Sequence, residues 1–165
     1  MIDVARIDEM LLNDFRDGYL ITFLDYHAKE FGWTTVFTRS VTRDALRFLG
    51  LSAIPLPDRE SPEQMQVMVC SPIVDKIVDA IFLDSPLLVW LERNIFHTRL
   101  LHVPYYAHGE TNPVRRDLRY SFTLALMRND GYNLHPEIWP EQLPANYKEC
   151  IGGCPPPCHV YAIAE

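Results

Sequence analysis

Four residues that can bind a soft metal ion lie close together near the end of the chain. Cys150, Cys154, Cys158 and His159 fall within ten residues, and zinc accepts thiolates and imidazole as ligands. The three prolines between the last two cysteines favour a polyproline II helix, which would hold these cysteines about 12 Å apart. Two sulfurs that share one zinc ion must lie within about 4 Å of each other. The sequence therefore favours no cofactor, and a zinc site made of these four residues is the alternative.

Arginines in two groups could bind phosphates or the carboxylates of a partner, because the planar guanidinium forms paired hydrogen bonds with both. The arginines of the first group recur every four residues, which would place them on one face of a helix. Asp44 and Asp117 lie beside the two groups, so we favour pairing within the chain or between subunits. The two groups are Arg39, Arg43 and Arg47, and Arg115, Arg116 and Arg119.

The segment from residue 131 to 147 carries large apolar side chains between prolines. Its prolines disfavour a helix or a central strand, but its apolar side chains are too many to stay in water. We therefore expect the segment to dock, either on a protein partner or on the core of its own chain. The sequence leaves both alternatives open. The expected anchors are Trp139, Tyr132, Ile138 and Tyr147.

The composition limits the classes of protein to which the chain can belong. Its 165 residues fit one domain, and a hydrophobic fraction of 48% is enough to form a core. The net charge of −7, from 15 basic and 22 acidic residues, disfavours a protein that coats nucleic acid. No run of 18 apolar residues occurs, and the acidic start lacks the features of a signal peptide. We therefore expect a cytoplasmic protein that is not secreted and has no membrane partner.

Capping residues divide the first two thirds of the chain into predicted helices. Gly32 is placed to end a helix over residues 19–31. A further helix, capped by Ser40 or Thr42, is expected to run through Leu49. Ser71 and Ser85, each followed by proline, predict two more helix starts. Serine accepts a backbone hydrogen bond at the N-cap, and the N–H that proline lacks would be unpaired there.

Runs of β-branched and aromatic residues predict strands. The two longest runs are separated by a turn-rich link that contains Gly109 and Pro113, so we expect them to pair as antiparallel strands. The predicted strands cover residues 33–38, 65–70, 98–106, 118–127 and 159–164.

These elements predict an α+β fold. It has a helical N-terminal part, a small, mostly antiparallel sheet and a Pro-rich, extended C-terminal tail. Seven of the 13 prolines lie after residue 112. We expect residues 1–130 to form a single α+β domain, and residues 131–165 to form a Pro- and Cys-rich extension packed on that domain or on a partner.

One stretch of the chain resembles a known family. Residues 77–94, with the run DSPLLVWL, are followed by VPYY and by Asn112. This order is similar to the early part of tailed-phage major capsid proteins. The resemblance is confined to residues 77–112 and does not extend to the whole capsid fold. It implies a virion or mobile-element protein.

Enzyme motifs such as Gly-x-Ser-x-Gly, His-Glu-x-x-His and a phosphate-binding Gly-rich loop do not occur in the sequence. We therefore expect a non-catalytic protein–protein interaction or assembly protein, such as an adaptor, a virion or mobile-element structural protein, or an inhibitor. It would act through its aromatic, Pro-rich tail and its charged helix faces, as a homo-oligomer or as part of a larger assembly. One alternative is a small metal- or thiol-dependent protein that uses Cys150, Cys154, Cys158 and His159. A second alternative is a nucleic-acid-binding protein that uses the two arginine groups.

Overall fold

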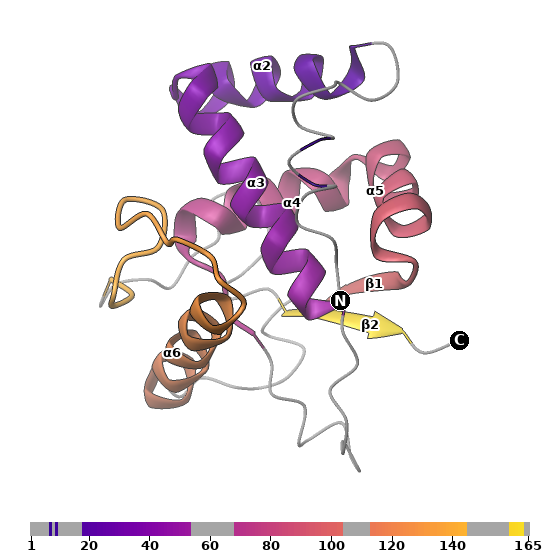
Figure 1. Ribbon diagram of the computed structural model, residues 1–165. Helices are drawn as coiled ribbons and strands as arrows, with labels where there is room; N and C mark the ends of the chain where they lie inside the picture. Colours follow the sequence, from indigo (N-terminus) through magenta and orange to yellow (C-terminus); the bar gives the residue numbers. More distant parts are fainter. Residues whose placement is uncertain are drawn as a thin grey trace.

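A computed structural model describes residues 18–53, 68–103, 113–144 and 159–163, together with Ile7 and Glu9. Helices make up most of this part of the chain (Figure 1). The α-helices are α2 (Tyr19–Phe31), α3 (Thr35–Ser52), α4 (Pro72–Leu83), α5 (Ser85–Leu91) and α6 (Pro113–Asn129). A π-helical turn, η2 (Glu92–Phe96), extends α5, and the two described strands are β1 (Arg99–Val103) and β2 (His159–Ile163).

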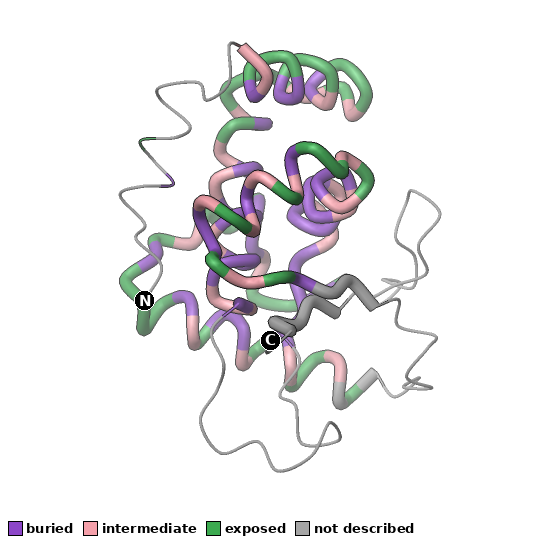
Figure 2. The backbone as a smooth tube through the Cα atoms, turned by 90° about the vertical axis from the view of Figure 1, so that its right-hand side faces the viewer, coloured by how far each residue is buried: buried purple, intermediate pink, exposed green. Residues whose placement is uncertain are grey.

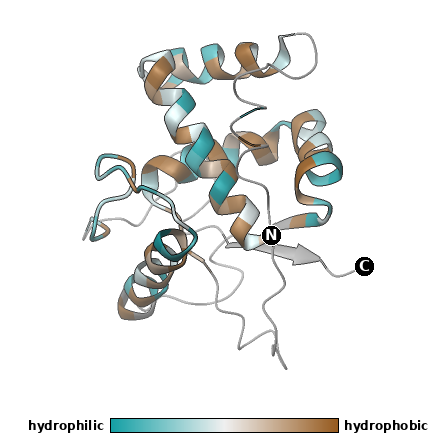
Figure 3. Ribbon diagram, in the orientation of Figure 1, coloured by the Kyte–Doolittle hydropathy of each residue, from teal (hydrophilic) through white to brown (hydrophobic). Residues whose placement is uncertain are grey.

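The long helix α3 forms the centre of the fold, where it packs against α2 and α4. Hydrophilic and hydrophobic residues alternate along α3 (Figure 3), because only its inward-facing side chains enter the core. Val41, Ala45, Phe48 and Leu49 are completely buried on that side. The outer helix α2 is buried along one face and exposed along the other (Figure 2). Most of the described core therefore lies between helices.

The predicted α+β fold is wrong, because the described part of the chain is mostly helical and helices take the place of two expected strands. Residues 33–38 hold the start of α3, where the Thr34 hydroxyl accepts a hydrogen bond from the backbone N–H of Phe37 at 3.2 Å. Residues 118–127 lie within α6, and residues 68–71 form neither helix nor strand. Tyr120, Leu124 and Met127 are buried at helical spacing on α6, so burial on one helix face outweighs their preference for a strand.

The described strands form one two-stranded antiparallel ladder, in which Arg99 lies opposite Ile163 and Val103 lies opposite His159. The predicted strands at 98–106 and 159–164 are therefore present in shortened form. Their pairing differs from the prediction, because the partner of β1 comes from the far end of the chain. No residue of the described part adds a third strand to this ladder.

Short sequence signals fix the helix ends. Gly32 ends α2 as predicted, in the left-handed conformation with φ of 67°. Ser71 is the N-cap of α4, and its hydroxyl accepts a hydrogen bond from the N–H of Val74 at 3.2 Å. The second predicted cap is displaced by one residue, because the Asp84 carboxylate, and not Ser85, accepts from the N–H of Leu87.

The segment from residue 130 to 144 contains no helix or strand and runs beside α3 and α6 (Figure 1). Its large apolar side chains, Tyr132, Ile138, Trp139 and Leu143, are buried in the core of this chain. The Tyr120 hydroxyl on α6 holds the segment by donating a hydrogen bond to the carbonyl of Pro140 at 2.7 Å. The division into a domain of residues 1–130 and an extension of residues 131–165 stays a prediction.

Within the described ranges, no helix is long and apolar enough to cross a bilayer. Cys70, just before α4, is buried. Its sulfur lies 3.3 Å from a carboxylate oxygen of Asp75, which is also buried.

Candidate functional site

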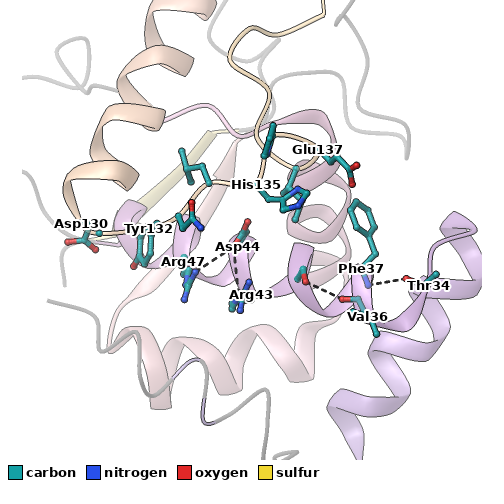
Figure 4. Close-up of a pocket in the computed structure, with 16 residues that line it drawn as sticks. Thr34, Val36, Phe37, Arg43, Asp44, Arg47, Asp130, Tyr132, His135 and Glu137 are labelled. Atoms are coloured by element: carbon teal, nitrogen blue, oxygen red, sulfur yellow. Dashed lines mark hydrogen bonds and ion pairs between the residues drawn. The ribbon is translucent and has the colours of Figure 1, made fainter.

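A pocket of about 770 Å³ lies between one face of α3 and the segment 130–138 (Figure 4). Helix α3 contributes both charged and apolar side chains to it, and the segment forms the opposite wall. Its volume is within the range of small-molecule sites. The lining residues that matter for its chemistry are Arg43, Asp44, Arg47, Tyr132, His135 and Glu137.

Asp44 is the buried acidic residue of the pocket, with only 4% of its surface exposed. Its oxygen Oδ2 accepts a hydrogen bond from the indole Nε1 of Trp139 at 3.1 Å. Its other oxygen, Oδ1, lies 3.7 Å from Arg47 Nη1 and 3.9 Å from Arg43 Nε. Burial raises the pKa of Asp44 above its ordinary value, and the two arginines, the indole hydrogen bond and His135 oppose this rise.

The helical repeat of α3 explains how these charged groups meet. Arg43 and Arg47 are four residues apart and share one side of the helix, whereas Asp44 lies on the side that faces the core. The Arg47 guanidinium is 4.7 Å from the centre of the Tyr132 ring, which gives it a cation–π contact. Gly131, with φ of 84°, turns the chain after α6 and leads Tyr132 toward α3.

The Arg43 side chain differs from that of Arg47 in its exposure to solvent. Arg47 is largely covered, but the Arg43 side chain is 43% exposed. The Nε atom of Arg43 is nevertheless buried and forms no hydrogen bond with any described residue. Its separation from Asp44 exceeds hydrogen-bond distance. The pocket therefore contains a cationic side chain whose N–H donors form no hydrogen bond with the described residues.

Replacement of Asp44 tests the buried contact with Trp139. Asp44→Ala is expected to lower the free energy of unfolding by about 1–3 kcal/mol, because the indole N–H would stay buried without an acceptor. Asp44→Asn keeps an acceptor oxygen and should lose less. Urea unfolding of both variants and of the parent at neutral pH measures this difference. Equal losses for alanine and asparagine would contradict a role of the indole hydrogen bond.

The same variants give a pH dependence of known sign. Because the pKa of Asp44 is raised in the folded chain, its contribution to stability is fully present below the ordinary carboxyl pKa and is lost as pH rises through the folded value. The asparagine in Asp44→Asn cannot ionise, so this variant does not lose stability through ionisation at position 44 as pH rises. The stability of Asp44→Asn relative to the parent should therefore rise between about pH 4 and pH 7. A relative stability that is constant or falls over this range would contradict the raised pKa.

A second hollow, a groove of 620 Å³, lies between α2 and the corner where α4 meets α5. Tyr26 of α2 and Leu83 of α4 stand at this groove with exposed fractions of 62% and 80%. His27 also lines the groove, and its Nδ1 atom lies 2.8 Å from the Glu30 carboxylate. No hydroxyl of the described residues forms a hydrogen bond with His27.

The structure places the predicted site residues in different surroundings. Arg43 and Arg47 line the pocket, whereas Arg39 is exposed on α3 outside it. The other group lies on α6, where Arg116 forms an ion pair with Asp117 at 2.7 Å. The backbone of Arg115 and the partly buried Arg119 lie in the same helix, so the two groups lie on separate helices.

Three of the four expected anchors of the tail are described by the structure, and one is not. Trp139, Tyr132 and Ile138 contact the core of their own chain, and Tyr147 lies outside the described residues. Of the proposed metal ligands, Cys150, Cys154 and Cys158 also lie outside the described residues, and only the backbone of His159 is described, in β2. Zinc binding by these four residues stays a prediction.

Sequence reasoning identified Asp44 only as a neighbour that pairs with arginines. It missed the contact with Trp139, which joins residues 95 positions apart. One signal was present, since Asp44 falls between Val41, Ala45 and Phe48 on the apolar side of the helix. An acidic residue at such a position requires a buried donor as its partner.

Comparisons of this chain with protein-family models, with curated proteins and with solved structures found no match. Any function of the chain must therefore be inferred from the chemistry of its own pocket and groove.

Proposed function

We propose that this chain is a non-catalytic protein–protein interaction or assembly protein. Its contact surface is the groove between α2 and the α4–α5 corner. The observation that carries the proposal is the exposure of Tyr26 and Leu83 together at this groove. Burial of exposed large apolar side chains is energetically favourable, and a protein partner bound at this groove would bury them.

Hydrogen bonds to one residue join the two walls of the groove, which favours binding. The Tyr19 hydroxyl of α2 donates to the Asp84 carboxylate, with its oxygen 2.6 and 2.8 Å from the two carboxylate oxygens. Asp84 also caps α5. One residue thus ties the two walls of the groove together, and a partner that binds here need not order them first.

A second copy of the chain is the partner that this surface fits. Leu83 projects beside the groove, so the same surface carries both a protruding side chain and a hollow. Two such surfaces can face each other about a two-fold axis, each receiving the leucine of the other. The proposal involves no cofactor. A cytoplasmic or virion location and a phage origin stay predictions.

Two matched leucine variants test the proposal. Leu83→Ser is expected to weaken self-association by about thirtyfold, the loss typical of a central interface anchor. Leu118→Ser on α6 is the control, because Leu118 is 65% exposed but lies outside the groove. Sedimentation velocity over a range of concentrations measures association for the parent and both variants.

The proposal predicts that the parent and Leu118→Ser associate alike. A parent chain that stays monomeric at every accessible concentration would contradict assembly through this groove. Equal weakening by the two variants would also contradict it, since a general loss of surface hydrophobicity would then explain the result.

A further inference from the structure

Arg43 lines the pocket beside α3 with a partly exposed side chain. Arg43 has five N–H donors, but the described part of the chain supplies no hydrogen bond to its guanidinium, and its Nε atom is buried. A buried donor without an acceptor costs about 1–3 kcal/mol. The Nη atoms of the same guanidinium are accessible to solvent, so an anionic group that enters the pocket can bind them.

The charges near Arg43 favour an anion as that ligand. Two guanidinium groups, of Arg43 and Arg47, face the single carboxylate of Asp44. Asp44 already uses one oxygen for the Trp139 indole. Asp130 and Glu137 also line the pocket, but both are exposed, and water screens their charge more strongly than it screens the buried groups. The inner part of the pocket therefore keeps an excess of positive charge.

The apolar side chains that line the pocket are suited to contact an apolar part of a ligand. Phe37, Val36 and Ile138 line the pocket together with the polar groups. Figure 4 shows Phe37 and Arg43 on the same side of the opening, opposite the segment that carries His135. A ligand bound to the guanidinium can therefore also contact apolar side chains of the same pocket.

We propose that this pocket binds a small organic anion, a carboxylate or phosphate group attached to an apolar body. Arg43 receives the anionic group through its guanidinium, and the side chains of Phe37 and Ile138 contact the body. Carboxylates and phosphates both match the planar donor pattern of arginine. This site shares no lining residue with the groove proposed for protein contact, so it gives the chain a second, independent function.

The indole N–H resonance of Trp139 reports on the pocket in nitrogen-15 NMR spectra, because this group donates to Asp44. Trp139→Phe assigns the resonance. Phenyl phosphate and benzoate are the anionic probes, and benzyl alcohol is the neutral probe with the same ring. We expect a saturable shift at millimolar concentrations with at least one anion and none with the alcohol. The anion that binds more tightly identifies the preferred group.

Two arginine variants locate the bound anion. Arg43→Gln should weaken binding about 10- to 100-fold, as expected for loss of hydrogen bonds to a charged group. Arg39→Gln removes the same charge one turn earlier, outside the pocket, and should change binding less than twofold. An unchanged Trp139 resonance in both unliganded variants shows that the fold is intact.

Three results would overturn the proposal. They are the absence of a saturable shift with both anions, binding of benzyl alcohol as tight as that of the anions, and equal weakening by the two arginine variants. The self-association of the parent does not enter this experiment, so its outcome is independent of the function proposed for the groove.

Discussion

Trp139→Ala is expected to lower the free energy of unfolding by about 3–5 kcal/mol. The side chain is among the largest that are completely buried in the described part of the chain. Its ring lies near those of Phe48 and Tyr120, with ring centres 6.3 and 6.4 Å away. Alanine would leave a cavity between α3, α6 and the segment 130–144, and would remove the only described donor to Asp44 Oδ2. Denaturant unfolding measures the loss.

Trp139→Phe separates the two contributions of this residue. Phenylalanine keeps most of the apolar contact but lacks the indole N–H, so it should lose much less stability than alanine. Sedimentation of the same samples shows whether the mass changes. Because Trp139 is buried in its own chain, the mass of the folded variants should equal that of the parent. A fully stable Trp139→Ala protein with altered mass would contradict this placement and favour a partner as the docking surface.

Asp84→Ala is expected to lower the free energy of unfolding by about 2–4 kcal/mol, from the loss of a helix cap and of a hydrogen bond to a carboxylate. Asp84 accepts from the Tyr19 hydroxyl of α2 and from the backbone N–H of Leu87 in α5. Alanine provides neither acceptor, so α5 would lose its N-cap and α2 would lose a contact that spans 65 residues. Thermal and denaturant unfolding measure the effect.

The neighbouring serine is the matched control. Ser85→Ala should change stability by less than about 0.5 kcal/mol, as is usual for exposed residues without a structural contact. Ser85 is exposed and is not the cap of α5. A larger loss of stability for Ser85→Ala than for Asp84→Ala would indicate that Ser85, and not Asp84, is the N-cap of α5. Tyr19→Phe should reproduce only the part of the loss that comes from the contact between α2 and Asp84.

The backbone conformation of several helix ends was determined by the sequence itself. Gly32 ends α2 because glycine reaches the left-handed conformation without steric strain. Ser71 followed by proline starts α4. The serine hydroxyl accepts a hydrogen bond from one N–H of the first turn, and proline has no N–H that would stay unpaired there. The absence of helix and strand in residues 131–144 also agrees with the prolines of that segment. Each of these signals acts within about one turn of the chain.

The choice between helix and strand at other positions required the tertiary structure. Residues 118–127 contain strand-forming side chains, but Tyr120, Leu124 and Met127 bury one face of a helix against the core. Thr34, within a β-branched run, caps α3 instead of entering a strand. Local preferences differ by only about 1 kcal/mol or less per residue, so burial of several large side chains on one helix face can reverse them.

The candidate site depends on contacts between distant parts of the chain. The spacing of Arg43 and Arg47 placed both on one face of α3, and the apolar, Pro-rich composition of the segment after Gly131 required it to dock. Only the fold brings that segment against this face, pairs Trp139 with Asp44 and leaves Arg43 Nε without an acceptor. The physical reason is that helix caps and turns are decided by neighbouring residues, whereas the partner of a buried polar group is decided by which side chains the packing of the whole core brings within hydrogen-bond distance.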